Sequence, residues 1–183
     1  QLLSHLYPLS EGSVSIGHND PSQNGDLQAL RQSVAYLPQD PVIFKSTLRD
    51  NLDLTHREAD PDLVAALMKV GMGPWFESID RNLDYELQEK GKNLSLGEKQ
   101  LLGLARCLLQ KSSIFILDEA TSALDPVTEK IVLSVLKQEY RGKTLLFVTH
   151  RLQTLGICDE ILWLEKGKVK LKGRASDMIS DLK

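Results

Sequence analysis

The sequence predicts an α/β fold with a mostly parallel sheet, and two features of its second half support that prediction. The apolar run 114–117 is too short for a helix and is typical of a strand buried on both faces, as in parallel sheets. A second apolar run, rich in β-branched residues, occupies 144–148. Between them, Asp125 and Pro126 predict the N-cap and first turn of a helix. Strand, helix and strand in this order form the βαβ unit that makes neighbouring strands parallel.

Length and composition restrict the class of protein. A chain of 183 residues with 42% hydrophobic and 26% charged residues suits one globular domain, or a domain with a subdomain. The formal net charge of −3 gives no electrostatic reason to expect a nucleic-acid partner. Cys107 and Cys158 lie outside any CxxC pattern, so no metal or redox motif is predicted.

The beginning of the chain predicts short elements. Residues 1–7 have leucines at helical spacing and end before a proline, which predicts the last part of a helix. Residues 14–16 predict a short strand, 27–31 one helical turn and 34–37 a further strand. Because helical sequence is already under way at Gln1, we expect the chain to be a piece of a longer protein.

The middle of the chain predicts several helices. Ser46 is expected to cap a helix that ends at about Asn51. Asp60 and Pro61 predict the N-cap and first turn of the next helix, and Gly71 predicts its end. The helix that follows Asp125 is expected to bury its apolar positions, which include Ile131, Val132, Val135 and Leu136.

Ser95 and Glu98 form an S-x-x-E capping box at the start of a long helix. A well-capped helix start is by itself a sufficient explanation of this pattern. The functional interpretation adds that Gly97 permits close approach, so that free amides and the positive end of the helix dipole face an anion. The buried side of this helix is predicted to comprise Leu101, Leu102, Leu104, Ala105, Leu108 and Leu109.

Asp118 and Glu119 directly follow the first apolar strand. Open α/β sheets bind ligands beyond the carboxyl ends of their strands, and adjacent carboxylates repel each other unless a cation or basic group is near. His150, after the second strand, and Gln39, between two prolines after another strand, are predicted to reach the same edge. We therefore predict a metal and phosphate site, although an acidic strand end, a loop glutamine and a solvated histidine are the simpler alternatives.

Four stretches of the sequence resemble the motifs of an ATP-binding-cassette (ABC) ATPase. SSIFILDEATSALD resembles the Walker B strand and D-loop, LSLGE the signature sequence, LPQD the Q-loop and VTH the H-loop switch. LPQDPVIFKSTLRDNLD together with NLSLGEKQLLGLARCLL resembles the second nucleotide-binding domain of C-type transporters, the multidrug-resistance-protein branch. The intact Glu119 is also similar to the second rather than the first domain of that branch.

The resemblance implies a P-loop NTPase-like (RecA-like) fold with a helical signature subdomain. Residues 1–183 would form a partial ABC ATPase domain, in which 1–38 and 112–183 belong to the catalytic core and 39–111 to the Q-loop and helical signature subdomain. No G-x-x-x-x-G-K-[ST] loop occurs in the 183 residues. We therefore expect the Walker A loop and the N-terminal strands of the domain to be missing through truncation, and the chain alone to bind ATP poorly.

The resemblance also implies roles for the residues at the sheet edge. Asp118 would hold Mg²⁺ through water, and Gln39 would reach the metal and the attacking water while coupling to transmembrane domains. Glu119 would orient or deprotonate that water, and His150 would contact the γ-phosphate. These roles suit phosphoryl transfer, in which positioning and charge stabilisation supply most of the catalysis.

A second group of residues would serve an ATP molecule held by an opposing domain. Ser95 and the Gly97 backbone would bind its γ-phosphate, and Asp125 would lie in the loop that links the two sites. Leu96 and Glu98 stand where the family usually has Gly and Gln. Glu98 would add repulsion near the triphosphate, although its capping role could hold the carboxylate on the helix side. In C-type transporters this signature would complete the weaker, less hydrolytic site, so we expect a modest effect.

The function implied by the resemblance is ATP binding and hydrolysis that powers export, with ATP and Mg²⁺ as cofactors. The partners would be a second nucleotide-binding domain and transmembrane domains, at the cytoplasmic face of a membrane, with no nucleic acid. One alternative is a non-hydrolysing regulatory cassette that completes a partner's ATP site through Ser95. Another is an ABC ATPase of DNA repair or translation, which the transporter-like Q-loop and the acidic net charge disfavour.

Overall fold

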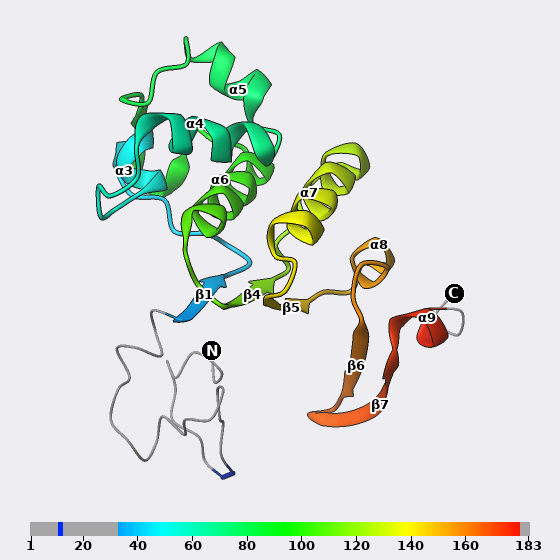
Figure 1. The fold of residues 1–183 in the computed structure, drawn as a ribbon. Helices are drawn as coiled ribbons and strands as arrows, with labels where there is room; N and C mark the ends of the chain where they lie inside the picture. Colours follow the sequence, from blue (N-terminus) through cyan, green and yellow to red (C-terminus); the bar gives the residue numbers. More distant parts are fainter. Residues whose placement is uncertain (1–10, 13–32, 180–183) are drawn as a thin grey trace.

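The computed structural model describes residues 11–12 and 33–179. At its centre lies a three-stranded parallel sheet of β1 (Val34–Leu37), β4 (Ile114–Asp118) and β5 (Thr144–Val148), in the order β1-β4-β5. Figure 1 shows the helices α6 (Leu96–Leu109) and α7 (Pro126–Glu139) on one side of this sheet. The predicted parallel α/β sheet is confirmed, while the elements predicted within residues 1–7, 14–16 and 27–31 lie outside the described residues.

Burial differs between the strands of the sheet. Phe115, Ile116 and Leu117 of the central strand β4 are buried, as predicted for a strand covered on both faces. The edge strand β5 is half-buried at its three central residues and exposed at both ends. Helix α6 approaches β1 so closely that a side chain at Gly103 would collide with Leu37. This close contact joins the helical region to the sheet.

The helical region lies between β1 and β4 in the sequence. Its elements besides α6 are β2 (Ser46–Thr47), α3 (Leu48–Leu52), α4 (Asp60–Lys69), α5 (Gly73–Ser78), β3 (Glu86–Leu87) and the 3₁₀ turn η1 (Glu89–Gly91). The side chains of Leu48, Leu67, Phe76 and Leu102 are wholly buried at its centre. Helices α4 and α6 pack against each other, and the antiparallel pair β2–β3 closes one end.

Two predicted helix caps differ from the structure. Thr47, not Ser46, is the N-cap of α3, because its Oγ1 accepts a hydrogen bond from the Asp50 amide at 3.1 Å. The Ser46 hydroxyl instead donates to the Asp50 carboxylate. Two adjacent residues can both offer a capping hydroxyl, and only that of Thr47 accepts from a backbone amide of the first turn.

The second difference concerns α4. Ala59 is its N-cap, and Asp60 is already the first helical residue, followed by the predicted Pro61. The Asp60 carboxylate pairs with the Arg49 side chain instead of capping its own helix. The end of the helix agrees with prediction, since Gly71 has a φ of +88° two residues beyond Lys69.

The two long helices begin as predicted but one buried face differs. Asp125 caps α7, and Ser95 caps α6. Ile131 was predicted to be buried but is exposed, whereas Leu133 is buried. The buried stripe of α7 is centred on Val132 and includes the polar Glu129, which a count of apolar residues alone misses.

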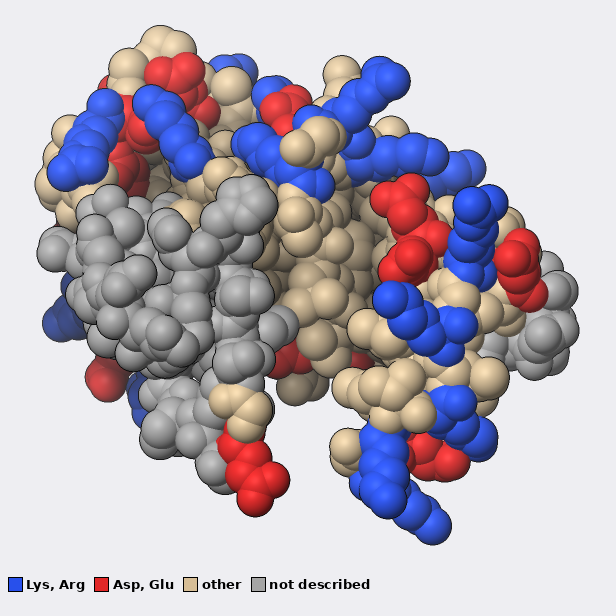
Figure 2. Space-filling view, turned by 60° about the horizontal axis from the view of Figure 1, so that its bottom comes forward, with Lys and Arg blue, Asp and Glu red and all other residues tan. Residues whose placement is uncertain are grey.

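The end of the described chain is a hairpin of β6 (Glu160–Glu165) and β7 (Lys168–Arg174), flanked by the short helices α8 (Leu152–Leu155) and α9 (Ala175–Met178). The predicted hairpin is confirmed, with Lys166 and Gly167 in the left-handed region at its turn. On the face of the hairpin that Figure 2 shows, positive and negative side chains are intermixed. Within residues 11–12 and 33–179, no helix is long and apolar enough to cross a membrane.

Candidate functional site

The acidic pair lies at the carboxyl end of the central strand. Asp118 is the last residue of β4 and pairs with Val148 of β5. Glu119 follows, and its amide donates to the Val148 carbonyl at 2.9 Å. Its φ of +49° is in the left-handed region, which costs a non-glycine residue about 1–2 kcal/mol. Surrounding bonds must therefore hold this turn in place, as is common at functional sites.

Glu119 contacts His150, which comes two residues after β5. The His150 Nδ1 and Glu119 Oε1 atoms are 2.9 Å apart. The His150 side chain is 77% exposed, whereas that of Glu119 is only 19% exposed. Glu119 Oε2 is buried and has no hydrogen-bond partner among the described residues. A buried carboxylate oxygen without a partner is costly, so this atom is suited to receive a water or another polar ligand.

Asp118 is in contact with the neighbouring strand β1. The Tyr36 hydroxyl donates to Asp118 Oδ2 at 3.2 Å. Burial, followed by the negative charge of Asp118, raises the pKa of Tyr36 above its usual value. Tyr36 was not predicted as a site residue, although its place one strand over and two residues before Pro38 puts it at the same sheet edge.

Gln39 follows β1 in the loop between Pro38 and Pro41, and its side chain is exposed. Its backbone carbonyl accepts a hydrogen bond from Gln100 Nε2 at 3.4 Å. The structure therefore places the Gln39 backbone beside α6. It gives no direct contact between the Gln39 side chain and either of the two acidic residues.

The capping box at the start of α6 is complete. Ser95 Oγ accepts from the Glu98 amide at 3.2 Å, and Glu98 Oε2 accepts from the Ser95 amide at 2.7 Å. The Glu98 carboxylate is thus held on its own helix, and Leu96 is exposed beside it. Gly97 lies so close to the Ala123 carbonyl that an added Cβ would be 3.3 Å from it. The small residue lets α6 approach the turn after β4.

Asp125 has a structural role in this chain. Its Oδ1 accepts from the amides of Val127 and Thr128, at 3.0 and 3.1 Å, and its Oδ2 accepts from the Thr128 hydroxyl at 2.5 Å. The Thr128 hydroxyl, and then the backbone amides, lower the pKa of Asp125 below its usual value. The carboxylate is therefore occupied in starting α7.

Sequence reasoning missed two polar clusters that hold the turn 119–124. The first, which we call the amide cluster, is Gln100 with its partners Gln39, Glu119, Ser122 and Ala123. Gln100 shares the helix face of Leu104 and Cys107, at intervals of four and seven residues, and this pattern indicated its burial.

The second cluster, which we call the ionic cluster, is Arg151 with Glu129 and Thr121. Arg151 Nη1 lies 2.7 Å from Glu129 Oε2 and donates to the Thr121 carbonyl at 2.8 Å. The Thr121 hydroxyl donates to Glu129 Oε1 at 2.9 Å. Glu129 lies at a buried position of α7, three residues before Val132, which was its only signal in the sequence.

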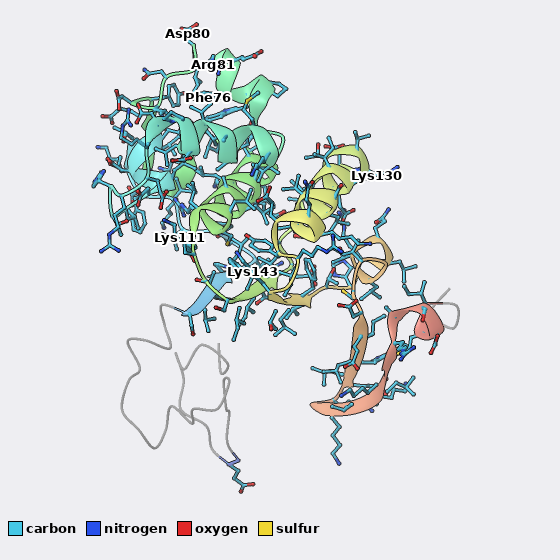
Figure 3. All side chains as sticks on the ribbon, in the orientation of Figure 1. Phe76, Asp80, Arg81, Lys111, Lys130 and Lys143 are labelled. Atoms are coloured by element: carbon cyan, nitrogen blue, oxygen red, sulfur yellow. The ribbon has the colours of Figure 1, made fainter. Side chains whose placement is uncertain are left out.

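A groove of about 370 Å³ lies between α4, the end of α6 and the end of α7. Figure 3 labels Lys111 and Lys143, two of its lining residues, close to the sheet below α6 and α7. Lys111 precedes β4 and Lys143 precedes β5, so the groove lies at the opposite end of the strands from Asp118. Its Lys69 is paired with Glu139 at 2.7 Å. The groove is thus separate from the sheet edge that carries Asp118 and Glu119, which we call the acidic edge.

The residues of the acidic edge fit a hydrated metal ion. No group of three or more His, Cys, Asp or Glu residues that could hold a metal occurs in the part of the chain that the structure describes. Mg²⁺ does not need such a group, because it is usually bound by one or two carboxylates, water and substrate phosphates. Asp118 at the strand end and the unpartnered Glu119 Oε2 are compatible with that mode of binding.

Residues 1–122 match the family model described as ABC transporter. The chain belongs to the ABC transporter family. It is 37% identical, over 92% of its length, to ATP-binding cassette sub-family C member 4 of Homo sapiens. It is 39% identical, over 92% of its length, to the oligomycin resistance ATP-dependent permease of Saccharomyces cerevisiae. The resemblance to C-type family members is therefore confirmed.

The fold is also similar to that of a solved ABC exporter. A bacterial Atm1-family ABC exporter, solved with ATP bound, superposes with a TM-score of 0.90 and 30% identity, covering 98% of this chain and 32% of that one. This likeness confirms the P-loop NTPase-like fold class. The chain spans only 13% of the length of the two C-type and permease relatives named above.

Proposed function

We propose that this chain is the part of an exporter's ATPase domain that positions the reacting groups for ATP hydrolysis. The observation that supports this most directly is the contact of Glu119 with His150 at the carboxyl ends of adjacent parallel strands. A phosphate and a water molecule would meet these groups at the sheet edge, where α/β folds bind ligands. The solved relative with bound ATP supports the choice of nucleotide.

Glu119 is proposed to orient the attacking water and accept its proton through Oε2. That oxygen is buried and without a partner among the described residues, while Oε1 is engaged with His150. His150 uses Nδ1 for Glu119, which leaves Nε2 of an exposed ring to contact the γ-phosphate. Asp118 and Gln39 are proposed to hold Mg²⁺, which when bound neutralises the charge that develops on the phosphates.

Two further features concern partners. None of the 183 residues forms a G-x-x-x-x-G-K-[ST] loop, so we propose that the main phosphate grip is supplied from outside this chain and that the chain alone is inactive. Ser95 and the Gly97 backbone are proposed to contact ATP held by a second nucleotide-binding domain, with Asp125 near that interface. Residues 39–111 are proposed to form the Q-loop and helical signature subdomain. This subdomain would couple the chain to transmembrane domains at the cytoplasmic face of a membrane.

The test is Glu119→Gln in the full-length protein that contains this chain. Loss of the carboxylate should reduce ATP turnover by about 10²–10³-fold or more while nucleotide binding is kept. Glu160→Gln is the matched control, since Glu160 is exposed on the β6–β7 hairpin and lies 3.7 Å from Lys172. Near-normal hydrolysis by the Glu119 variant would show that this residue is not the catalytic carboxylate.

The regulatory alternative is supported by the exposed, fully capped start of α6. In that case Glu119→Gln would leave turnover by the assembled protein unchanged, whereas Ser95→Arg, which blocks the helix start, would abolish it. The two variants measured together therefore separate a hydrolysing domain from one that only completes a partner's site.

A further inference from the structure

Gln100 lies one turn into α6, directly behind the helix start, and only 1% of its surface is exposed. Its Nε2 donates to Ser122 Oγ at 2.9 Å, to the Glu119 carbonyl at 3.2 Å and to the Gln39 carbonyl at 3.4 Å. Its Oε1 accepts from the Ala123 amide at 2.9 Å. One buried amide thus joins α6 to two segments, the Q-loop backbone at Gln39 and the turn 119–124, whose bonded residues are 19 to 61 positions away in the sequence.

The chemistry of the partners determines how the amide is oriented. The carbonyls of Glu119 and Gln39 can only accept, and the Ala123 amide can only donate, so the nitrogen and oxygen of Gln100 cannot be exchanged. A carboxylate at this position would have no proton to donate to the carbonyls. An apolar side chain would leave both the carbonyls and the amide without this partner.

The bond to the Glu119 carbonyl has a consequence for the carboxylate. Glu119 adopts a left-handed backbone conformation, with a φ of +49°. Its amide donates to the Val148 carbonyl, and its carbonyl accepts from Gln100 Nε2 at 3.2 Å and from the Ser122 amide at 3.0 Å, so the peptide groups on both sides of the strained residue are fixed. These bonds set the direction in which the carboxylate leaves the backbone toward His150. Without Gln100 the Glu119 carbonyl keeps only the bond from its own turn, so the turn loses its hydrogen bonds to α6 and can move the carboxylate.

We propose that Gln100 is a positioning residue that holds Glu119 and the Q-loop backbone in the geometry for hydrolysis. The proposal rests on the proposed function of Glu119. It assigns Gln100 no contact with nucleotide, because the side chain is buried and its polar atoms face protein atoms. Loss of Gln100 should therefore lower kcat and leave the affinity for ATP nearly unchanged.

The experiment compares variants of the full-length protein that contains this chain. Gln100→Met keeps the side-chain volume and removes the hydrogen bonds, and Gln100→Glu keeps the shape but removes the donors. Both should lower kcat by about 10²-fold, the cost of an approximately 1 Å misplacement of a reacting group. The affinity for a fluorescent ATP analogue should stay within about 3-fold of that of wild type, because contacts made equally in the ground state and the transition state are kept.

Leu104→Ala is the control for lost stability. Leu104 is wholly buried one turn further along α6, and its truncation leaves a cavity but removes none of the hydrogen bonds of the amide cluster. A merely structural role of Gln100 predicts that all three variants lose kcat in proportion to the fall in Tm. The positioning role predicts that Leu104→Ala keeps its kcat at a comparable fall in Tm.

Ser122→Ala provides a milder variant of the same cluster, should the Gln100 variants fail to fold. It removes one acceptor of Gln100 Nε2 and lies outside α6. It should lower kcat by about 3-fold at unchanged nucleotide affinity, because the free energy lost is only a fraction of that of one hydrogen bond. Normal kcat in the folded Gln100 variants, or in Ser122→Ala where those do not fold, would overturn the proposal. So would a parallel loss of nucleotide affinity.

The outcomes also separate this inference from the proposed function. If wild type hydrolyses ATP and Glu119→Gln does not, a Gln100→Met variant with normal kcat contradicts the positioning role alone. If Glu119→Gln hydrolyses ATP normally, the role of Glu119 is wrong, and the positioning role of Gln100 is overturned with it.

Discussion

The amide cluster and the ionic cluster hold the same turn from two sides by different chemistry. Gln100 reaches the turn from α6 with a neutral side chain that is fully buried. Arg151 reaches it from the loop after β5 with a charged side chain that is 24% exposed and is paired with the buried Glu129 of α7. The turn that contains Glu119 is therefore attached both to the helical region and to the sheet.

The difference between the clusters predicts how each responds when it is broken. A neutral amide that is removed leaves a few carbonyl and amide groups without partners, and the cost is that of those hydrogen bonds. An ion pair that loses one member leaves a charge that is no longer compensated, and the cost is larger. Single and double substitutions can therefore distinguish them.

The largest effect is expected for Glu129→Leu. This change leaves Arg151 unpaired beside the Thr121 carbonyl, at a cost of about 3 kcal/mol because the arginine retains some contact with water. The Tm of the domain should fall by about 6–12 °C, measured by scanning calorimetry. Adding Arg151→Met should restore most of the loss. A double variant no more stable than Glu129→Leu would mean that the charge is not the cause.

A smaller effect is expected for Thr121→Val. The substitution keeps the shape of the side chain and removes the hydroxyl that donates to Glu129 Oε1. It should cost about 1–3 kcal/mol, because one oxygen of the buried carboxylate loses its partner. Thr144→Val, at the exposed start of β5, is the matched control and should change the Tm little. Equal shifts for the two variants would contradict the importance of this hydrogen bond.

Ser122→Ala should have a weaker effect on stability than either change in the ionic cluster. Gln100 Nε2 retains the carbonyls of Glu119 and Gln39 when the serine hydroxyl is lost. We expect about 0.5–1 kcal/mol, measured as the shift in Tm against Ser134→Ala on the exposed face of α7. A loss as large as that of Glu129→Leu would show that the two clusters do not differ in the proposed way.

The smallest effect, and the one that depends on pH, is expected for Asp125→Ala. The Thr128 hydroxyl and backbone amides lower the pKa of Asp125 below its usual value of 3.8, so the folded protein favours the ionised carboxylate. This stabilisation is present in full above about pH 4 and is lost as the pH falls through the lower pKa of the folded state. The Tm of wild type should therefore approach that of Asp125→Ala in acid.

Two further variants serve as references for the Tm of Asp125→Ala in acid. Asp125→Asn should cap α7 at every pH, because the asparagine amide can accept the same backbone bonds and does not titrate in this range. The Tm difference between wild type and Gln100→Met should not vary over the same range, since Gln100 has no titratable group. A gap for Asp125→Ala that is constant with pH would contradict the role given to its carboxylate.

Much of the fold followed from local patterns. The strand 114–117, the hairpin near the end of the chain and the caps Ser95 and Asp125 were predicted because each depends on residues a few positions apart. Ile131 was wrongly placed in the core because the buried stripe of α7 contains a glutamate in place of an apolar residue.

The sequence by itself determined that two carboxylates and a histidine reach one edge of a parallel sheet. The order strand, helix, strand allows few arrangements, and the carboxyl ends of parallel strands lie together. Only the tertiary structure decided that Glu119 meets His150 and that Gln100 and Arg151 support the turn between them. The physical reason is that helical spacing can place a polar side chain on the buried face of its helix, but the hydrogen-bond partners of that side chain lie far away in the chain and are not given by the spacing.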